Sequence, residues 1–232
     1  MTSLGVAPDA SCLIDNAWIC AEYLRTRQGE LVDATEQHLI ITVASVALGL
    51  VVALPLALLA RRYRRAEAAV LGTATGLYTV PSLALFSLLL PFTGLGKDTV
   101  IIGMALYSLT ILVRNLIAGL DGVPTDVVEA ARGMGYGAAR MLVRVELPLA
   151  LPAIMAGVRV ATVSTVALTT VGAIVGAGGL GTLLYEAFPS QFKAQILAAS
   201  VLCVLLAVVL DVALLGAQRL MTPWAADRSR NR

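Results

Sequence analysis

IITVASVALGLVVALPLALLA, residues 40–60, is a run of 21 residues without a charged side chain, and RRYRR, residues 61–65, follows it directly. A second uncharged run of 29 residues covers 68–96. Both runs exceed the roughly 18 residues that mark a membrane-spanning helix. They predict an all-α, polytopic membrane protein.

The composition of the whole chain agrees with these runs, since 58% of its 232 residues are hydrophobic and 14% are charged. Soluble domains carry about 25% charged residues, so a soluble globular enzyme is excluded. A nucleic-acid partner is excluded as well, because the net charge is only +2. The chain has one histidine, His38, and three scattered cysteines, so we expect no metal site of His or Cys ligands.

Apolar segments of sufficient length predict about five membrane-spanning helices. They are expected at Leu39–Ala60, Ala69–Pro91, Thr99–Leu120, Leu151–Val175 and Ala194–Ala217. Pro55 and Pro81 fall inside spans, where prolines are tolerated and are more often packing kinks than gates. The spans define a transmembrane domain at 39–217, with tails at 1–38 and 218–232.

The placement of basic residues predicts the orientation in the membrane. Eleven of the 17 Lys and Arg residues follow span one, lie in the loop after span three or close the chain, and four lie on the other side. The side richer in Lys and Arg faces the cytoplasm. The N-terminus is therefore expected outside and the C-terminus in the cytoplasm, which an odd number of spans satisfies. His38 is then expected to be an interfacial polar residue at the outer boundary of span one.

Two features of the N-terminal tail remain open from the residues alone. Trp18, Tyr23 and Leu24, with charges nearby, suit a short helix at the membrane surface, but a disordered segment fits equally well. Cys12 and Cys20 either form a disulfide, if the tail lies outside the cell, or remain free thiols.

The cytoplasmic loop at 121–150 has an internal pattern of its own. Good helix formers at 127–134, VVEAARGM, follow a Pro-Thr-Asp start. Three glycines in alternate positions, 133, 135 and 137, then break the helix. An amphipathic segment at 138–152 leads into span four. The pattern predicts a helix, a glycine turn and a second helix, which together present a short helix end to a soluble partner.

This loop resembles the EAA loop of ABC importer permeases. Glu129-Ala130-Ala131 is followed after three residues by Gly135, and after nine more by an aliphatic residue, one residue and Leu-Pro. The resemblance implies the type I ABC importer permease fold and a coupling role, in which the loop docks into an ATP-binding subunit. The positions implied in coupling are Glu129, Ala130, Ala131, Gly135, Glu146, Leu147 and Pro148.

Further segments resemble the osmoprotectant branch of this family, which carries glycine betaine, carnitine and choline. They are VPSLAL at 80–85, YSL at 107–109 and GAGGLG at 176–181. Methionine-type permeases share the five-helix core and the loop, so a permease for methionine or another amino-acid-like solute is the alternative. A secondary transporter is less expected, because we find no clear internal repeat.

The chain is expected to bind no ATP and no cofactor. Its only Gly-Lys pair, Gly96-Lys97, is followed by Asp98, where a P-loop needs Ser or Thr. ATP is therefore expected on separate subunits. The resemblance implies two ATPase subunits, a second permease chain that is identical or paralogous, and an external substrate-binding protein, assembled at a bacterial plasma (inner) membrane.

Two groups of residues are candidates for the pathway or gate. Ser82 beside Pro81 is a candidate for lining the path. The glycines of 176–181 give a backbone that bends or packs closely, and we place this bend near the outer gate. The glycines concerned are Gly176, Gly178, Gly179 and Gly181.

Charged and aromatic residues inside the spans are a third group. Arg114, Arg159 and Asp211 share a depth near the cytoplasmic side, and intramembrane charges are functional candidates. We expect Asp211 to pair with one of the arginines. Aromatic residues in spans two and three are candidates to face a quaternary ammonium group, although core packing is the more common role of such residues. They are Tyr78, Phe86 and Tyr107.

Overall fold

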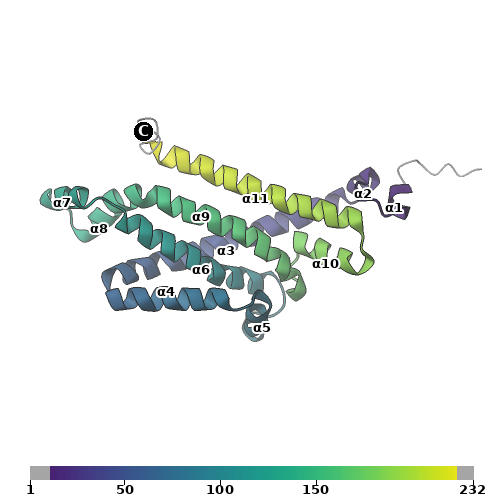
Figure 1. Cartoon of the computed structure of the whole chain (residues 1–232), viewed down its shortest axis with the longest axis horizontal. Coiled ribbons are helices and arrows are strands. Elements are labelled where there is room, and N and C mark those ends of the chain that lie inside the picture. The colour runs from purple at the N-terminus through teal and green to yellow at the C-terminus, as the bar shows by residue number, and fades with distance from the viewer. Residues whose placement is uncertain (1–10, 224–232) are drawn as a thin grey trace, which may run out of the picture.

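Residues 11–223 are described by a computed structural model, and every regular element among them is a helix (Figure 1). In chain order these are α1 Ser11–Ile14, α2 Ala21–Thr26, α3 Gln28–Arg62, α4 Arg64–Thr79, α5 Ser82–Thr93, α6 Lys97–Asp121, α7 Thr125–Gly133, α8 Ala138–Met141, the π-helical turn η1 Leu142–Glu146, α9 Leu147–Thr169, the 3-10 segment η2 Thr170–Val175, α10 Leu180–Ser190 and α11 Lys193–Met221. The outer parts of both predicted tails, 1–10 and 224–232, lie outside the described residues.

Four helical stretches within 11–223 are long and apolar enough to cross a membrane. They are α3, α6, α11 and the stretch Ala138–Val175, which runs from α8 to η2. The pair α4 and α5 makes a fifth if it is counted as one span. The prediction of an all-α polytopic protein with about five spans is confirmed.

Span two differs from the single helix expected at Ala69–Pro91. It consists of α4 and α5, which are bent by 101° with respect to each other. Val80, between them, is extended with φ −67° and ψ 129°, because the ring of Pro81 disfavours the helical conformation in the preceding residue. Pro81 also lacks the N–H group that would continue the helix. The span is therefore broken at the proline, where only a kink was expected.

Span one is longer than predicted. Its helix, α3, begins at Gln28, well before the expected Leu39. Leu31 and Ala34, one helical turn apart, are buried and belong to a hydrophobic cluster with residues of α10 and α11. This packing extends the helix through a polar segment that apolar content alone assigns to the tail.

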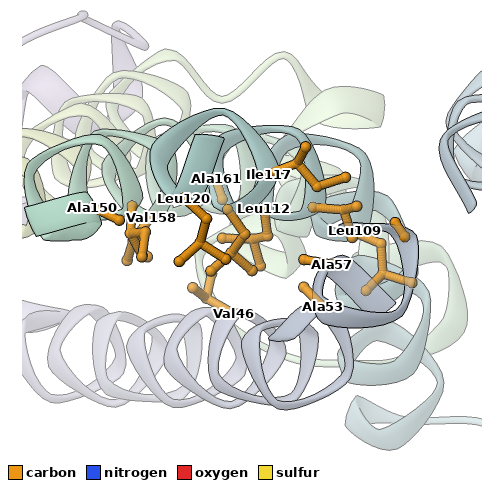
Figure 2. Packing of buried hydrophobic residues seen from close by; sticks show 14 of the residues in the cluster. Val46, Ala53, Ala57, Leu109, Leu112, Ile117, Leu120, Ala150, Val158 and Ala161 are labelled. Atoms are coloured by element: carbon orange, nitrogen blue, oxygen red, sulfur yellow. The ribbon is translucent and has the colours of Figure 1, made fainter. Parts of the chain in front are cut away.

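The core is centred on α6, which packs between α3 and α9. Ala53 and Ala57 of α3 have no exposed surface and meet Leu109 and Leu112 of α6 (Figure 2). Small residues let two helix backbones approach closely, and such contacts favour helix association in a membrane. The close fit of α3 to α6 fixes the framework that carries both ends of the molecule.

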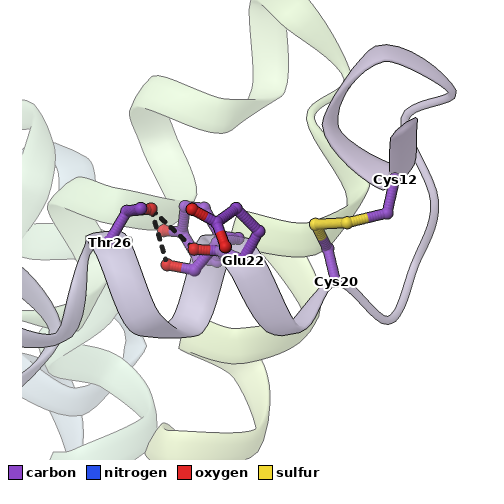
Figure 3. Close-up of a disulfide and its surroundings, with 5 residues drawn as sticks. Cys12, Cys20, Glu22 and Thr26 are labelled. Carbon is purple, nitrogen blue, oxygen red and sulfur yellow. Dashed lines mark hydrogen bonds between the residues drawn. A yellow bond between two sulfur atoms is a disulfide. The ribbon is translucent and has the colours of Figure 1, made fainter. Parts of the chain in front are cut away.

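The two ends of the molecule carry different elements (Figure 1). One end holds α7 and α8, and the other holds α1, α2 and α10. The N-terminal segment is folded at this second end, where Cys12 and Cys20 form a disulfide (Figure 3). Of the two alternatives for this cysteine pair, the structure has the disulfide.

The described part of the tail is attached to the connection between α10 and α11. Asn16 donates from Nδ2 to the Gln191 carbonyl at 3.0 Å, and its Oδ1 accepts from the Lys193 backbone N–H at 2.9 Å. Tyr23 packs edge-on against Phe192 with ring centroids 5.2 Å apart. Through Asn16 and Tyr23, this part of the tail is packed against the connection between α10 and α11.

Candidate functional site

The glycine turn after α7 has the geometry of a helix C-terminus that ends on a left-handed residue. The Met134 N–H donates to the Ala130 carbonyl and the Tyr136 N–H to the Ala131 carbonyl, each at 3.1 Å. Gly135 has φ +80°, which a residue with a side chain adopts only at a cost. The predicted helix and glycine turn are confirmed, and the left-handed turn accounts for the glycine at position 135.

The EAA triplet divides between the surface and the interior. Glu129 and Ala130 are exposed, whereas Ala131 is only 3% exposed. Met134, at the end of the helix, is 70% exposed, although methionine is usually buried. The exposed end of α7 thus combines a carboxylate, a small residue and an apolar side chain. Met134 was not among the predicted site residues, and the signal that points to it is its place inside the motif.

An arginine from span one holds both ends of the loop. Nε of Arg61 lies 2.9 Å from Oδ1 of Asp121, and Nη1 lies 3.0 Å from Oε2 of Glu146. The Glu146 side chain is only 12% exposed. Glu146 therefore braces the loop from inside and is not part of its outer face. Arg61 is a functional candidate that the sequence analysis used only to predict orientation, because its two partners follow it by 60 and 85 residues.

The second helix of the loop continues into span four through a wider turn. η1 precedes Leu147 and Pro148, which begin α9. Pro148 has no N–H to offer the carbonyl of Arg144, and a π-helical turn accommodates such a missing bond. The helical stretch nonetheless runs unbroken from Ala138 to Val175. Leu147 and Pro148 thus connect the loop rigidly to the membrane domain.

The break of span two brings together three candidate residues, Pro81, Ser82 and Tyr107. Pro81 is exposed and Ser82 begins α5. The hydroxyl of Tyr107 donates to the carbonyl of Val80, which holds the break against α6. Phe86 is 1% and Tyr107 6% exposed, so core packing is confirmed for both of these aromatic residues.

Tyr78 differs from the other two aromatic residues, because 45% of its surface is exposed. Its ring meets the ring of Tyr107 edge-on, with centroids 5.7 Å apart. Tyr78 is therefore not packed into the core of this chain. Its place in the last turn of α4, just before the break, leaves one side of the ring uncovered by this chain.

The glycine run forms a tight bend between η2 and α10. Gly176, Gly178 and Gly179 have φ values of +71°, +80° and +76°. The Gly179 N–H donates to Oε1 of Gln37 at 3.2 Å. A Cβ at Gly181 would lie 2.3 Å from the carbonyl oxygen of Thr170, so α10 starts in close contact with η2. The bend expected in this run is present, and it is closely packed.

His38 was expected to be an interfacial polar residue, but its side chain is buried inside the protein. It is 0% exposed, and Nε2 lies 2.9 Å from the carbonyl oxygen of Val166. Since a carbonyl only accepts, Nε2 carries the proton in this contact. A Cβ at Gly179 would lie 3.2 Å from Nδ1 of His38. His38 therefore joins α3, the end of α9 and the glycine bend.

The expected pairing of Asp211 is present in the structure, and its partner is Arg159. Nε and Nη2 of Arg159 donate to the two carboxylate oxygens of Asp211, each at 2.8 Å. A bidentate pair of this kind is directional as well as strong, and it joins α9 to α11. Arg114 has no carboxylate partner in the described part of the chain and donates to Oγ1 of Thr75 on α4 at 2.9 Å.

Comparison with known proteins matches these features to one family. Residues 41–227 fit the family described as binding-protein-dependent transport system inner membrane component. A choline transport system permease protein of Bacillus subtilis (strain 168) is 33% identical over 89% of this chain and 95% of its own length. An osmoprotectant import permease protein of Salmonella typhimurium is 37% identical over 87% of this chain and 96% of its own length.

Solved structures agree with this assignment. The MetNI methionine ABC transporter in an inward-facing conformation matches with a TM-score of 0.75 and 25% identity, over 85% of this chain and 98% of that chain. The resemblance found in the sequence, and the inner-membrane localisation that it implies, are confirmed. The chain belongs to the binding-protein-dependent transport system inner membrane components, the permease subunits of ABC importers.

Proposed function

We propose that this chain is the permease subunit of an ATP-driven importer for small osmoprotectants such as glycine betaine, choline or carnitine. Two relatives that are 33% and 37% identical over most of the chain, a choline and an osmoprotectant permease, support this substrate class. The observation that carries the transport role is the loop after span three, where an exposed helix end is braced on the membrane domain by Arg61.

In this proposal, the exposed end of α7 docks on an ATPase subunit. Ala130 allows close approach, and Glu129 and Met134 supply a charged and an apolar contact. Ala131 faces inward and keeps α7 attached to the loop. ATP binds to the partner subunits, and this chain binds no cofactor.

The proposed assembly has two such permease chains, identical or paralogous, with two ATPase subunits and an external binding protein. The loop and the C-terminus face the cytoplasm, and the N-terminus lies outside. The disulfide between Cys12 and Cys20 supports this orientation, because disulfides persist in oxidising compartments. The glycine bend and the break at Pro81 and Ser82 are the proposed outer gate and path.

The docking role is tested with Ala130→Trp, a bulky residue on the exposed face of α7. The matched control is Ser190→Trp, also exposed but at the end of α10. We expect Ala130→Trp to abolish co-purification of the ATPase and uptake, while membrane insertion is retained and Ser190→Trp behaves as the native chain. Gly135→Trp is expected to act in the same way. Native levels of ATPase association and uptake in Ala130→Trp would refute the docking role.

The bracing role of Arg61 is tested separately with Arg61→Gln, which removes both ion pairs. We expect ATPase association to persist while ATP hydrolysis no longer drives uptake, because the loop still presents α7 but transmits its movement poorly. Arg61→Lys keeps the charge and is expected to restore part of the coupling. A ratio of transport to hydrolysis equal to the native value in Arg61→Gln would exclude this role.

The substrate is tested by reconstituting the permease with its ATPase and binding protein in proteoliposomes. ATP-dependent uptake of labelled choline, glycine betaine or carnitine is expected, and uptake of L-methionine is not. The fold match to the methionine transporter makes methionine the informative competitor. Methionine uptake without uptake of any quaternary ammonium compound would replace the proposed substrate class.

A further inference from the structure

Tyr78 and Tyr107 form an aromatic pair at the point where span two is interrupted. Tyr78 lies in the last turn of α4, and the 101° bend to α5 follows it. Tyr107 lies on α6 and contacts Tyr78 edge-on at a centroid distance of 5.7 Å. The hydroxyl of Tyr107 is engaged with the carbonyl of Val80. The ring of Tyr107 is thereby fixed, and it positions the ring of Tyr78 in turn.

The pair lies near the middle of the membrane. Helix α6 has 25 residues, so it is about 37 Å long at 1.5 Å per residue. Tyr107 lies about 15 Å from the Lys97 end and about 21 Å from the Asp121 end on the same measure. The hydrocarbon core is about 30 Å thick. Both rings are therefore inside it, away from the headgroup level where interfacial tyrosines gather.

An uncovered tyrosine at this depth is unusual for a packing residue. Tyr78 is 45% exposed, whereas the neighbouring Phe86 and Tyr107 are buried. The described chain gives the Tyr78 hydroxyl no hydrogen-bond partner, although a phenol away from water normally has one. The ring is thus held in place from one side and is free on the other.

Two helix ends of opposite partial charge meet at the break, the C-terminus of α4 at Thr79 and the N-terminus of α5 at Ser82. The C-terminus of α4 ends beside Tyr78, and the C-terminal end of a helix carries a partial negative charge. Interrupted membrane helices place such ends at the midplane of transporters, where they face cations. An aromatic face attracts a quaternary ammonium group, and the attraction is larger where water is excluded. Tyr78 lies on the α4 side of the break, beside the negative helix end, so its ring is placed to receive a quaternary ammonium group.

We propose that Tyr78, positioned by Tyr107 at the break between α4 and α5, contacts the quaternary ammonium group of the substrate during its passage through the membrane. This inference rests on the proposed function. It assigns to this chain a selectivity step that is separate from recognition by the external binding protein, and it names Tyr107 as a positioning residue.

The test is uptake by the complete transporter in proteoliposomes at saturating binding protein, with labelled choline. Tyr78→Leu is expected to lower the kcat/KM of uptake by about three-fold to thirty-fold, the range of a cation–π contact. Tyr78→Phe keeps the ring and is expected to retain near-native uptake. Tyr185→Leu is the matched control, since Tyr185 is 57% exposed but lies on α10.

A series of fluorinated phenylalanines at position 78 separates a cation contact from a structural role. One, two and three ring fluorines weaken the negative face of the ring stepwise while changing its shape little. The logarithm of kcat/KM is expected to fall in proportion to the number of fluorines, with unchanged basal ATP hydrolysis and complex yield.

The outcomes distinguish this site from the proposed function. Native uptake of choline with a flat fluorine series would overturn the Tyr78 contact and leave the proposed function standing. An equal loss in Tyr78→Phe and Tyr78→Leu would also overturn it, because the ring would then not be the determinant. Absence of any quaternary ammonium uptake by the native complex would overturn both.

Discussion

Two glycine-rich turns at opposite ends of the molecule use glycine for different reasons. In the turn at the end of α7, a Cβ added at Gly133, Gly135 or Gly137 would meet nothing within 4 Å. In the bend before α10, a Cβ would lie 2.2 Å from Oε1 of Gln37 at Gly178 and 2.3 Å from the Thr170 carbonyl oxygen at Gly181. The first turn is open around its glycines, and the second is closely packed.

The difference separates a turn that presents a surface from a bend that joins helices. Gly135 is required for its positive φ, and the space around it stays free for the partner proposed above. Gly181 is required because α10 and η2 approach each other at the backbone. The substitutions below test this distinction, beginning with the largest expected effect.

Gly181→Ala adds a single methyl group and should be the most destabilising of these substitutions. Its Cβ would overlap the backbone of Thr170, which cannot move as a flexible side chain does. We expect a loss of about 3 kcal/mol in stability, the upper end of the usual range for an overpacking change. Thermal unfolding of the purified protein in detergent measures this loss. Gly216→Ala, in open space on α11, is the control, and equal melting temperatures for the two variants would contradict close packing of the bend.

Gly178→Ala should cost about 1–2 kcal/mol through its positive φ, and more by displacing Gln37. The added Cβ would meet the side chain of Gln37 and not the backbone. Removing that side chain should therefore recover part of the lost stability. In the Gln37→Ala background, Gly178→Ala is expected to cost less than it does alone. Simple additivity of the two unfolding free energies would show that the Gln37 contact has no influence.

Gly135→Ala should cost about 1–2 kcal/mol, because only the left-handed conformation is penalised and no neighbour is displaced. Gly135→Asn should cost less, since asparagine tolerates this conformation better. Both are measured by the same thermal unfolding, with membrane insertion as a check. A loss as large as that of Gly181→Ala would mean that the turn is packed and not open.

Gly133→Ala has the smallest expected effect, and its sign is opposite. Gly133 ends α7 without a positive φ and without neighbours within 4 Å. Alanine has the higher helix propensity, so a gain of up to about 1 kcal/mol is expected. A lower melting temperature than that of the native chain would refute the description of this turn as open.

Most of the membrane fold was predictable, because its signal is local. Apolar segments of sufficient length located the spans, and the spacing from Glu129 to Pro148 located the loop and its turn. The break in span two was missed, since Pro81 in an apolar run is compatible with a kink or a break. Which one forms depends on packing against α6, including the bond from Tyr107 to the Val80 carbonyl.

The candidate site was predictable only in part. The exposed end of α7 follows from the motif, but the bracing of the loop by Arg61 does not, because its acidic partners are distant in sequence. His38 was misplaced for the same reason. A polar residue next to a span is usually interfacial, and here the Val166 carbonyl on another helix accepts its hydrogen bond and permits burial.

The sequence by itself determined the membrane class, the approximate spans and the family. The free energy of transferring apolar side chains out of water is nearly additive along the chain, so local composition locates the spans. The EAA spacing lies within one segment and can be read without the fold. Only the tertiary structure decided the 101° break, the burial of His38, the bidentate pair of Arg159 and Asp211, and the exposure of Tyr78. Each of these depends on whether a residue far away in sequence lies close enough to satisfy a polar group or cover a ring.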